Sequence, residues 1–218
     1  MTNRRWLLLT QLLVALFVAS LTAPRAQAQT QASLSEPSNF MSLTTFELSL
    51  PLGDTKKYVT GGLGPGLGWE GRWTVNAHSS AGVSLSVAGF SRHTDATIDF
   101  PSGAATGDQL RQLMPAQLLA TGYVYPFQKN GVRWYAGGGV GGGHVDQDFT
   151  LGTQQLSRGA WHLVVAPEIG AEVRGGPDRL FVGVFSLRYN APIASGDYLG
   201  GGSRKFQYLT LRVGIGEE

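Results

Sequence analysis

The chain has no cysteine among its 218 residues. An exported chain of this length without cysteine must be held together by backbone pairing and packing rather than by disulfides, and a lipid anchor on cysteine is not expected. Long apolar runs are also scarce. After Leu21 none is long enough for a helix of about 20 residues across a bilayer. With 31 glycines, the rest of the chain is either a soluble β protein or a β-barrel that crosses a membrane.

The N-terminal residues 1–28 have the parts of a secretory signal peptide. Two arginines precede an apolar run at Trp6–Leu21, and a small-x-small sequence for signal peptidase ends at Ala28. We expect export and cleavage after Ala28. A polar periplasmic leader at residues 29–39 and a barrel domain at residues 40–218 then remain.

The charge balance indicates no nucleic-acid partner. The whole chain has 17 Lys and Arg against 15 Asp and Glu, and three of these arginines lie in the expected signal peptide, which leaves 14 − 15 = −1 for the mature chain. Nucleic-acid binders carry clustered Lys and Arg that neutralise phosphates, and no such cluster is visible. We therefore expect no nucleic acid among the partners.

From Phe40 onward, eight segments alternate apolar with polar or small residues at a period of two. This period places alternate side chains on opposite faces of a strand. The predicted strands are Phe40–Leu50, Leu63–Val75, Gly82–Ser91, Ala116–Phe127, Val132–Val145, Ala160–Arg174, Arg179–Tyr189 and Phe206–Ile215. Most of them reach the roughly 9–11 residues that a tilted strand needs to cross a membrane.

The connections between these strands alternate between short turns and long polar links. The short ones are Asn76–Ala81, Gln128–Gly131 and Gly175–Asp178, and the long ones are Pro51–Gly62, Arg92–Pro115, Asp146–Gly159 and Asn190–Lys205. Transmembrane barrels have short turns on the periplasmic side and longer loops outside, so an even strand count leaves both termini in the periplasm. Within the second long link, the segment Asp108–Met114 is a candidate short helix capped by Asp108.

Apolar residues share one face of each predicted strand, and the charged residues share the other. On the seventh strand, for example, Phe185 and Leu187 oppose Arg188. An Arg or Lys that faces lipid near the midplane costs about 2–4 kcal/mol, so the charges should point into the barrel. There they can form an ion-pair network that fills a lumen too narrow for an open channel. Its predicted members are Glu47, Glu70, Arg72, Glu168, Glu172, Arg174, Arg188 and Arg212.

Aromatic residues gather near the ends of the predicted strands. They are Trp69, Trp73, Tyr123, Tyr125, Trp134, Trp161, Tyr189 and Phe206. Membrane barrels carry such residues in girdles at both interfaces, although packing inside a soluble sandwich explains part of the pattern. The alternation leaves open which face Tyr123 and Tyr125 occupy.

The sequence resembles the small outer-membrane barrels of the OmpA and OmpX type. The resemblance rests on the signal peptide, the eight alternating strands, the short and long connections, and a last strand that reads Phe-Gln-Tyr-Leu-Thr-Leu-Arg-Val-Gly-Ile from Phe206. The resemblance covers the expected mature chain. It implies an all-β fold, an eight-stranded antiparallel up-and-down transmembrane β-barrel, in the outer membrane of a Gram-negative bacterium. It also implies contact with outer-membrane lipids and lipopolysaccharide, and insertion by the barrel-assembly machinery. Family members usually end on an aromatic residue, whereas this chain ends Gly216-Glu217-Glu218.

One connection brings together residues that are suited to chemistry. His144 and Asp146 end the fifth predicted strand, and His162 begins the sixth across the same link. A lipid A-modifying site at the outer rim is one interpretation, but the serine that deacylases place two residues from the histidine is missing. A metal site needs at least three convergent ligands, and only this link approaches that number. We favour incidental polar rim residues, and we expect no catalytic residue, no metal and no cofactor.

The run of glycines at 137–143 has a structural explanation rather than a chemical one. A phosphate-binding loop requires a following Lys-Ser/Thr and the start of a helix, and neither is present. Glycines inside a strand are typical of a bend or of a close approach by a neighbouring backbone.

These features predict a non-enzymatic outer-membrane barrel that is structural or binds an unknown ligand at four long external loops. Binding usually resides on loops that a rigid scaffold displays. Two alternatives stay open. One is an outer-membrane enzyme with the rim site, and the other is a soluble periplasmic barrel that encloses a small ligand.

Overall fold

The computed structural model describes residues 39–59, 62–100, 103–152, 154–175, 181–193, 196–197, 203–204 and 206–217. The predicted signal peptide and nearly all of the predicted leader lie outside the described residues. So do residues 176–180, which include most of the third predicted turn. The segment Ser38–Glu218 forms one compact unit.

This unit is almost entirely antiparallel β-sheet. Its elements are β1 (Phe40–Leu52), α2 (Gly53–Tyr58), β2 (Gly64–Asn76), β3 (Ser79–Ala88), β4 (Phe90–Phe100), β5 (Gly103–Lys129), β6 (Val132–Leu151), β7 (Gln154–Gly175), β8 (Phe181–Pro192), β9 (Gly196–Asp197), β10 (Ser203–Arg204) and β11 (Phe206–Glu217). Within the described ranges, no helix is long and apolar enough to cross a membrane.

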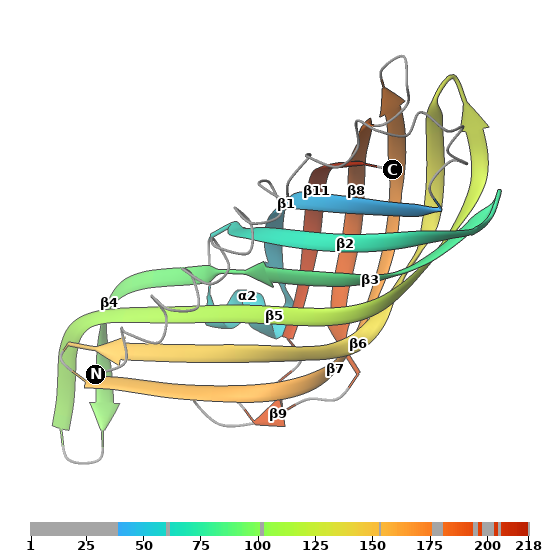
Figure 1. Ribbon diagram of the computed structural model, residues 1–218. Helices are drawn as coiled ribbons and strands as arrows, with labels where there is room; N and C mark the ends of the chain where they lie inside the picture. The colour runs from blue at the N-terminus through green and yellow to red at the C-terminus, as the bar shows by residue number, and fades with distance from the viewer. Residues whose placement is uncertain are drawn as a thin grey trace, which may run out of the picture. The chain divides into compact units, whose positions relative to one another are not determined.

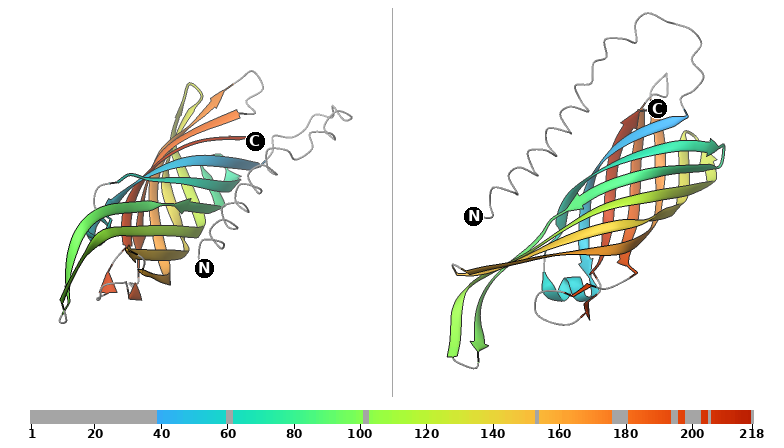
Figure 2. Two further views of the ribbon diagram at one scale, coloured as in Figure 1. Left: turned by 90° about the vertical axis from the view of Figure 1, so that its left-hand side faces the viewer. Right: turned by 60° about the horizontal axis from the view of Figure 1, so that its bottom comes forward.

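The sheet closes into a ring. Its strand order is β3-β2-β1-β11-β8-β7-β6-β5-β4, and an additional pairing between β3 and β5 joins the two ends (Figures 1 and 2). Because β4 follows β3 after the single residue Gly89, the two labels belong to one bent strand, and eight strands surround the lumen. The prediction of an eight-stranded antiparallel barrel is confirmed.

Three strands are much longer than predicted. The strand β5 has 27 residues, β6 has 20 and β7 has 22. Together with β4, they run past the end of the ring as a separate protrusion, which Figure 1 shows curving away from the barrel. The predicted loop Arg92–Pro115 is therefore mostly a β-hairpin, and Asp146–Gly159 is a second hairpin that closes between Leu151 and Gln154.

The predicted short helix at Asp108–Met114 is wrong. Residues 108–113 pair with β4, and residues 109–114 pair with β6, so most of this segment is bonded on both sides. Alternate residues also occupy opposite faces, since Gln109 and Leu113 are buried while Gln112 is exposed. A ladder on both sides satisfies more backbone groups than the isolated capping signal of Asp108.

The short connections lie at the other end of the barrel. The strands β2 and β3 are joined through residues 77–78, and β5 and β6 through Asn130 and Gly131. Both residues of the second turn have positive φ, 52° for Asn130 and 77° for Gly131. A two-residue type I′ turn requires this conformation, which Asn and Gly adopt at low cost.

The outside of the ring is apolar, as predicted. On the outer face of the sheet, the most exposed large apolar side chains are Trp161, Ile215 and Phe127, at 76%, 74% and 70%. The predicted girdle residues Trp69, Trp73 and Trp134 are exposed as well. In contrast, Tyr123, Tyr125 and Phe206 are buried inside the ring, so they are not girdle residues.

The glycine run allows β5 and β6 to pair closely. A Cβ atom at Gly141 would lie 2.1 Å from the Leu118 carbonyl oxygen, and one at Gly137 would lie 2.0 Å from the Gly122 carbonyl oxygen. Real Cβ atoms do not approach backbone oxygens to such distances. Glycine is therefore required at these two positions by the adjacent backbone.

Candidate functional site

The lumen of the ring contains a network of ion pairs that reaches from wall to wall. Three strands separate β2 from β7 in either direction round the ring, so these two strands lie opposite each other. Arg72 on β2 nevertheless donates from Nη1 to Glu172 Oε1 on β7 at 2.7 Å. A direct contact across the full width shows that side chains fill the lumen here.

Two further arginines connect several carboxylates each. Arg188 donates from Nε to Glu168 at 2.7 Å and lies 3.4 Å from Glu70. Arg212 lies 3.0 Å from Glu47, 3.0 Å from Glu70 and 2.9 Å from Glu168. Two of these contacts join residues directly opposite each other on neighbouring strands, Glu47 with Arg212 and Glu168 with Arg188.

Tyrosine hydroxyls donate further hydrogen bonds to the carboxylates. Tyr135 donates to Glu168 Oε1 at 2.9 Å, and Tyr123 donates to Glu168 Oε2 at 3.2 Å. Tyr125 donates to Glu172 at 2.7 Å. Buried charges are tolerated only when their remaining hydrogen-bonding capacity is also used, and the inward tyrosines supply part of it.

The network is balanced in charge. Its described ion pairs join the four carboxylates Glu47, Glu70, Glu168 and Glu172 to the four guanidinium groups Arg72, Arg133, Arg188 and Arg212. All eight residues are buried. Seven of them are the residues expected inside from the strand alternation.

Arg133 belongs to the network but was not predicted from the sequence. Arg174 was predicted, but it lies at the margin of the network. The Arg133 guanidinium carbon lies 3.9 Å from the centroid of the Tyr125 ring, and its Nη1 lies 3.9 Å from Glu172. Trp134 is exposed on the outside, so the alternation around it places Arg133 inside. Arg174 is only half-buried, one residue before the end of β7.

Apolar side chains close the lumen at the end with the long connections. They are Tyr58, Val59, Ala88, Phe90, Leu113, Val145, Phe206 and Tyr208. The helix α2 brings Tyr58 to this cluster, and the Gln207 amide donates to Thr55 Oγ1 at 2.8 Å, which ties the helix to β11. With charged residues filling the lumen and apolar residues covering it, an open channel and an enclosed apolar ligand site are both absent from the described part of the barrel.

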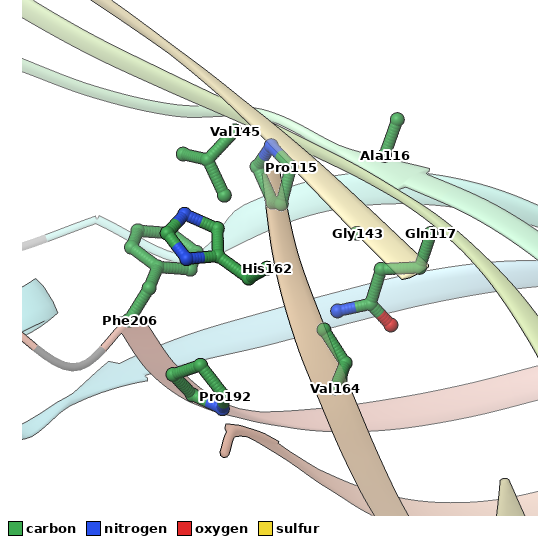
Figure 3. Close-up of a pocket in the computed structure, with 9 residues that line it drawn as sticks. All are labelled: Pro115, Ala116, Gln117, Gly143, Val145, His162, Val164, Pro192 and Phe206. Atoms are coloured by element: carbon green, nitrogen blue, oxygen red, sulfur yellow. The ribbon is translucent and has the colours of Figure 1, made fainter. Parts of the chain in front are cut away.

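A very small cavity of about 10 Å³, partly open, lies beside this cluster. Its lining residues are Pro115, Ala116, Gln117, Gly143, Val145, His162, Val164, Pro192 and Phe206 (Figure 3). His162 is buried on the inner side of β7. Gln117 donates to the Tyr208 hydroxyl at 2.6 Å, which links the cavity wall to the apolar cluster.

The predicted rim site of His144, Asp146 and His162 is not assembled. His144 Nε2 lies 3.1 Å from Asp146 Oδ1, and the His144 ring lies 4.8 Å from the exposed ring of Trp161, on the outer face of the sheet. His162 pairs in register with Gly143 and points to the inner face. The sheet itself therefore separates the two histidines. Among the described residues, no group of three metal-ligating side chains is present.

Beyond the ring, β4 to β7 form what we call the protruding sheet, residues 90–100, 103–114, 145–151 and 154–161. Among the described residues, the strand β4 forms a ladder with β5 alone. At the base of β4, Gly62 lies beside Ser91 and Gly64 lies beside Gly89, and beyond Ser91 no described strand lies on its second edge. On the far side of this sheet, β7 pairs with β8 only from Val164 onward. The protruding sheet thus continues the barrel wall without being closed into the ring.

The two faces of the protruding sheet differ in charge. The inner face, which continues the lumen side, carries Arg92, Arg111 and Arg158. The outer face, which continues the outside of the ring, carries Asp108, Asp146 and Asp148. At the base of the inner face, Phe90 and Leu113 join the apolar cluster.

No protein-family model matches the sequence, and the search of curated proteins found no match. Solved structures do resemble the fold. Neisserial surface protein A (NspA) is 12% identical with a TM-score of 0.51, over 84% of this chain and 99% of that one. Ail, the attachment invasion locus protein of Yersinia pestis, is 20% identical over 83% of this chain and 99% of that one, with a TM-score of 0.46. A major outer membrane protein from Thermus thermophilus is 14% identical over 81% and 98%, with a TM-score of 0.47.

The closed ring, its apolar outside and the likeness to NspA decide the fold. This chain is a small β-barrel of the outer-membrane type. In such a barrel the apolar belt faces lipid, and the charged interior is shielded from it. This barrel has its large apolar side chains outside and its charged side chains inside, which is the opposite of the arrangement expected of a soluble barrel around an apolar ligand.

Proposed function

We propose that this barrel lies in the outer membrane with both termini in the periplasm, and that it binds other proteins at the cell surface by adding their strands to β4. Export by the predicted signal peptide, insertion by the assembly machinery, and contact with lipid and lipopolysaccharide belong to this proposal. The short turns at one end and the long hairpins at the other support the orientation.

The open edge of β4 is the observation that carries the binding function. An unpaired edge presents free backbone donors and acceptors that another extended chain can use. Proteins usually protect such edges by keeping them short, by charged side chains, by a proline or by covering them. The strand β4 carries charged residues but has 11 residues and no proline, and beyond Ser91 the described residues place no strand on its second edge.

The attachment of the protruding sheet to the barrel favours binding. The strand β5 is continuous from the barrel wall to the hairpin, and β4 pairs with it along residues 90–100. A partner would therefore meet an edge that is already extended and held by a rigid base. Preorganisation of this kind reduces the ordering cost of association.

Catalysis and transport have less support. The residues considered for a rim enzyme lie on opposite faces of the sheet, and the lumen is filled by Arg72, Glu172 and their neighbours. Neither the separated histidines nor the filled lumen affects binding at the cell surface, because that binding uses only the protruding sheet.

A hairpin-shortened variant tests this function. His93 and Leu110 are direct partners, so residues 94–109 can be replaced by Asn-Gly without changing the barrel below. As the control, residues 149–156 of the second hairpin are replaced by Asn-Gly between the partners Asp148 and Ser157, which leaves β4 intact.

The probes are extended peptides of about ten residues with alternating β-forming side chains, offered to the barrel in lipid nanodiscs. Binding is measured by fluorescence anisotropy and by protection of β4 amides from hydrogen exchange. We expect peptides to bind the unaltered barrel and the control but not the variant shortened at residues 94–109. Absence of peptide binding and of β4 protection in the unaltered barrel would contradict the proposed function. Heat-modifiable gel migration verifies that each variant is folded.

A further inference from the structure

The part of the β4 edge that a partner can use has a defined start. At the base of the strand, Gly62 lies beside the Ser91 carbonyl group, so the chain itself lines the edge there. From Arg92 to Phe100 the second edge borders no described strand, while the first edge pairs with β5 in an unbroken register. A partner strand would therefore pair along residues 92–100.

A second copy of the chain can bring its own β4 edge to this position. Two identical strands that pair antiparallel are related by a two-fold axis, so each edge covers the other and no edge stays open. Residues directly opposite each other share a face of the sheet, so the axis passes through one residue and not between two. The register is then fixed by the residue that lies opposite itself.

Charge excludes the neighbouring registers. Like charges directly opposite each other destabilise a strand pair. An axis through residue 95 puts Asp95 opposite itself, and an axis through residue 97 puts Asp95 opposite Asp99. An axis nearer either end of the edge pairs residues 92–96 or 96–100 at most. Each of these registers has either a pair of like charges or few paired residues.

An axis through Ala96 pairs the whole of residues 92–100 without opposing like charges. The opposed residues are Arg92 with Phe100, His93 with Asp99, Thr94 with Ile98, and Asp95 with Thr97. Thr, Ile and Phe also favour extended structure. The order of residues along β4 is therefore complementary to itself in one register.

We propose that β4 pairs antiparallel with β4 of a second copy of this chain, about a two-fold axis through Ala96. This inference rests on the proposed strand addition and names its partner. The pairing uses backbone donors and acceptors, so it leaves Arg92 with the hydrogen bond that its Nε already donates to Thr94 Oγ1 at 3.0 Å.

Single cysteines test the register, because the chain has none of its own. The purified barrel is kept in detergent micelles, where two copies can meet in any orientation, and is treated with the oxidant diamide. Ala96→Cys should give a disulfide-linked dimer, because opposed Cα atoms lie about 4.5–5.5 Å apart and a disulfide spans this distance. Thr94→Cys is the matched control. Its two Cα atoms would lie about 13 Å apart along the strands, so it should not cross-link.

Substitutions at Thr97 test the charge argument. Thr97→Asp places an aspartate opposite Asp95 at two symmetric positions, so the dissociation constant of the dimer should rise by about two- to thirtyfold. Thr97→Asn is uncharged and similar in size, and it should leave the constant nearly unchanged. Sedimentation in density-matched detergent measures the constant, and gel migration before and after heating verifies that each variant is folded.

The outcomes distinguish this inference from the proposed function. Equal cross-linking of the Ala96→Cys and Thr94→Cys barrels would overturn the inference in favour of random collision. Absence of the Ala96→Cys cross-link, or a Thr97→Asp barrel that dimerises normally, would also overturn it, while protection of β4 by extended peptides would show that strand addition stands. If neither a second copy nor any peptide protects the β4 amides, the proposed function itself fails.

Discussion

Replacing Glu168 with Gln should strongly destabilise the barrel. Glu168 is only 2% exposed and receives hydrogen bonds from Arg188 at 2.7 Å, Arg212 at 2.9 Å and Tyr135 at 2.9 Å. Glutamine has nearly the same shape, so packing changes little. The substitution removes one buried negative charge, so the four guanidinium groups then face three carboxylates instead of four.

The size of the effect follows from burial. Removing one partner of a buried ion pair typically costs about 3–5 kcal/mol, because the other charge stays buried without compensation. We expect a loss within this range for Glu168→Gln. The control is Lys57→Gln, which removes an exposed pair with Asp54 at 3.1 Å and should cost less than about 1 kcal/mol.

The free energy of unfolding is measured by urea titration of the refolded barrel in lipid vesicles. Tryptophan fluorescence and gel migration report the transition. A second variant, Glu168→Gln with Arg188→Gln, restores the charge balance. Its loss should be smaller than the sum of the two single losses by about 0.5–3 kcal/mol. A loss below about 1 kcal/mol for Glu168→Gln, or strictly additive losses, would refute the view that charge balance maintains this network.

Three further results are expected. Gly141→Val should prevent folding, seen as loss of the heat-modifiable band on a gel, because its Cβ would lie 2.1 Å from the Leu118 carbonyl oxygen. The control Gly142→Val should fold normally, because a Cβ at that position has nothing within 4 Å. Phe206→Ala should cost about 3–5 kcal/mol in urea unfolding, because the ring is 6% exposed and packs on Phe90 and Tyr208. A cost near zero would mean that the apolar cluster at the end of the lumen contributes little to stability. Purified barrel in planar bilayers should show no stable conductance steps, because Arg72 contacts Glu172 across the lumen, and a reproducible open level would contradict a filled interior.

Much of the barrel could be predicted because its signal is local. Inside the membrane one face of each strand meets lipid and the other meets the lumen, so apolar and polar residues must alternate. The outward Phe185 and Leu187 and the inward Arg188 follow from this rule. For the same reason Arg133 and Tyr135, on either side of the exposed Trp134, could have been placed inside.

The protruding sheet was mistaken for loops for an equally physical reason. Beyond the membrane both faces of a strand meet water, so Arg92–Asp99 and Asp146–Thr150 carry polar residues on both sides and show little alternation of hydrophobicity. Their strand structure comes from pairing with β5 and β7 in two hairpins, which the hydrophobic pattern of successive residues does not show. A capping residue such as Asp108 cannot reveal that pairing.

The sequence by itself determined the eight strands and the outward and inward faces of most of them, because alternation is a property of successive residues. The export signal at residues 1–28 stays a prediction. Only the tertiary structure decided which residues of different strands share a face. A shift of one residue in register moves a side chain to the other side of the sheet, which is why His144 and His162 are separated. The same dependence on register places Arg92 opposite Arg111.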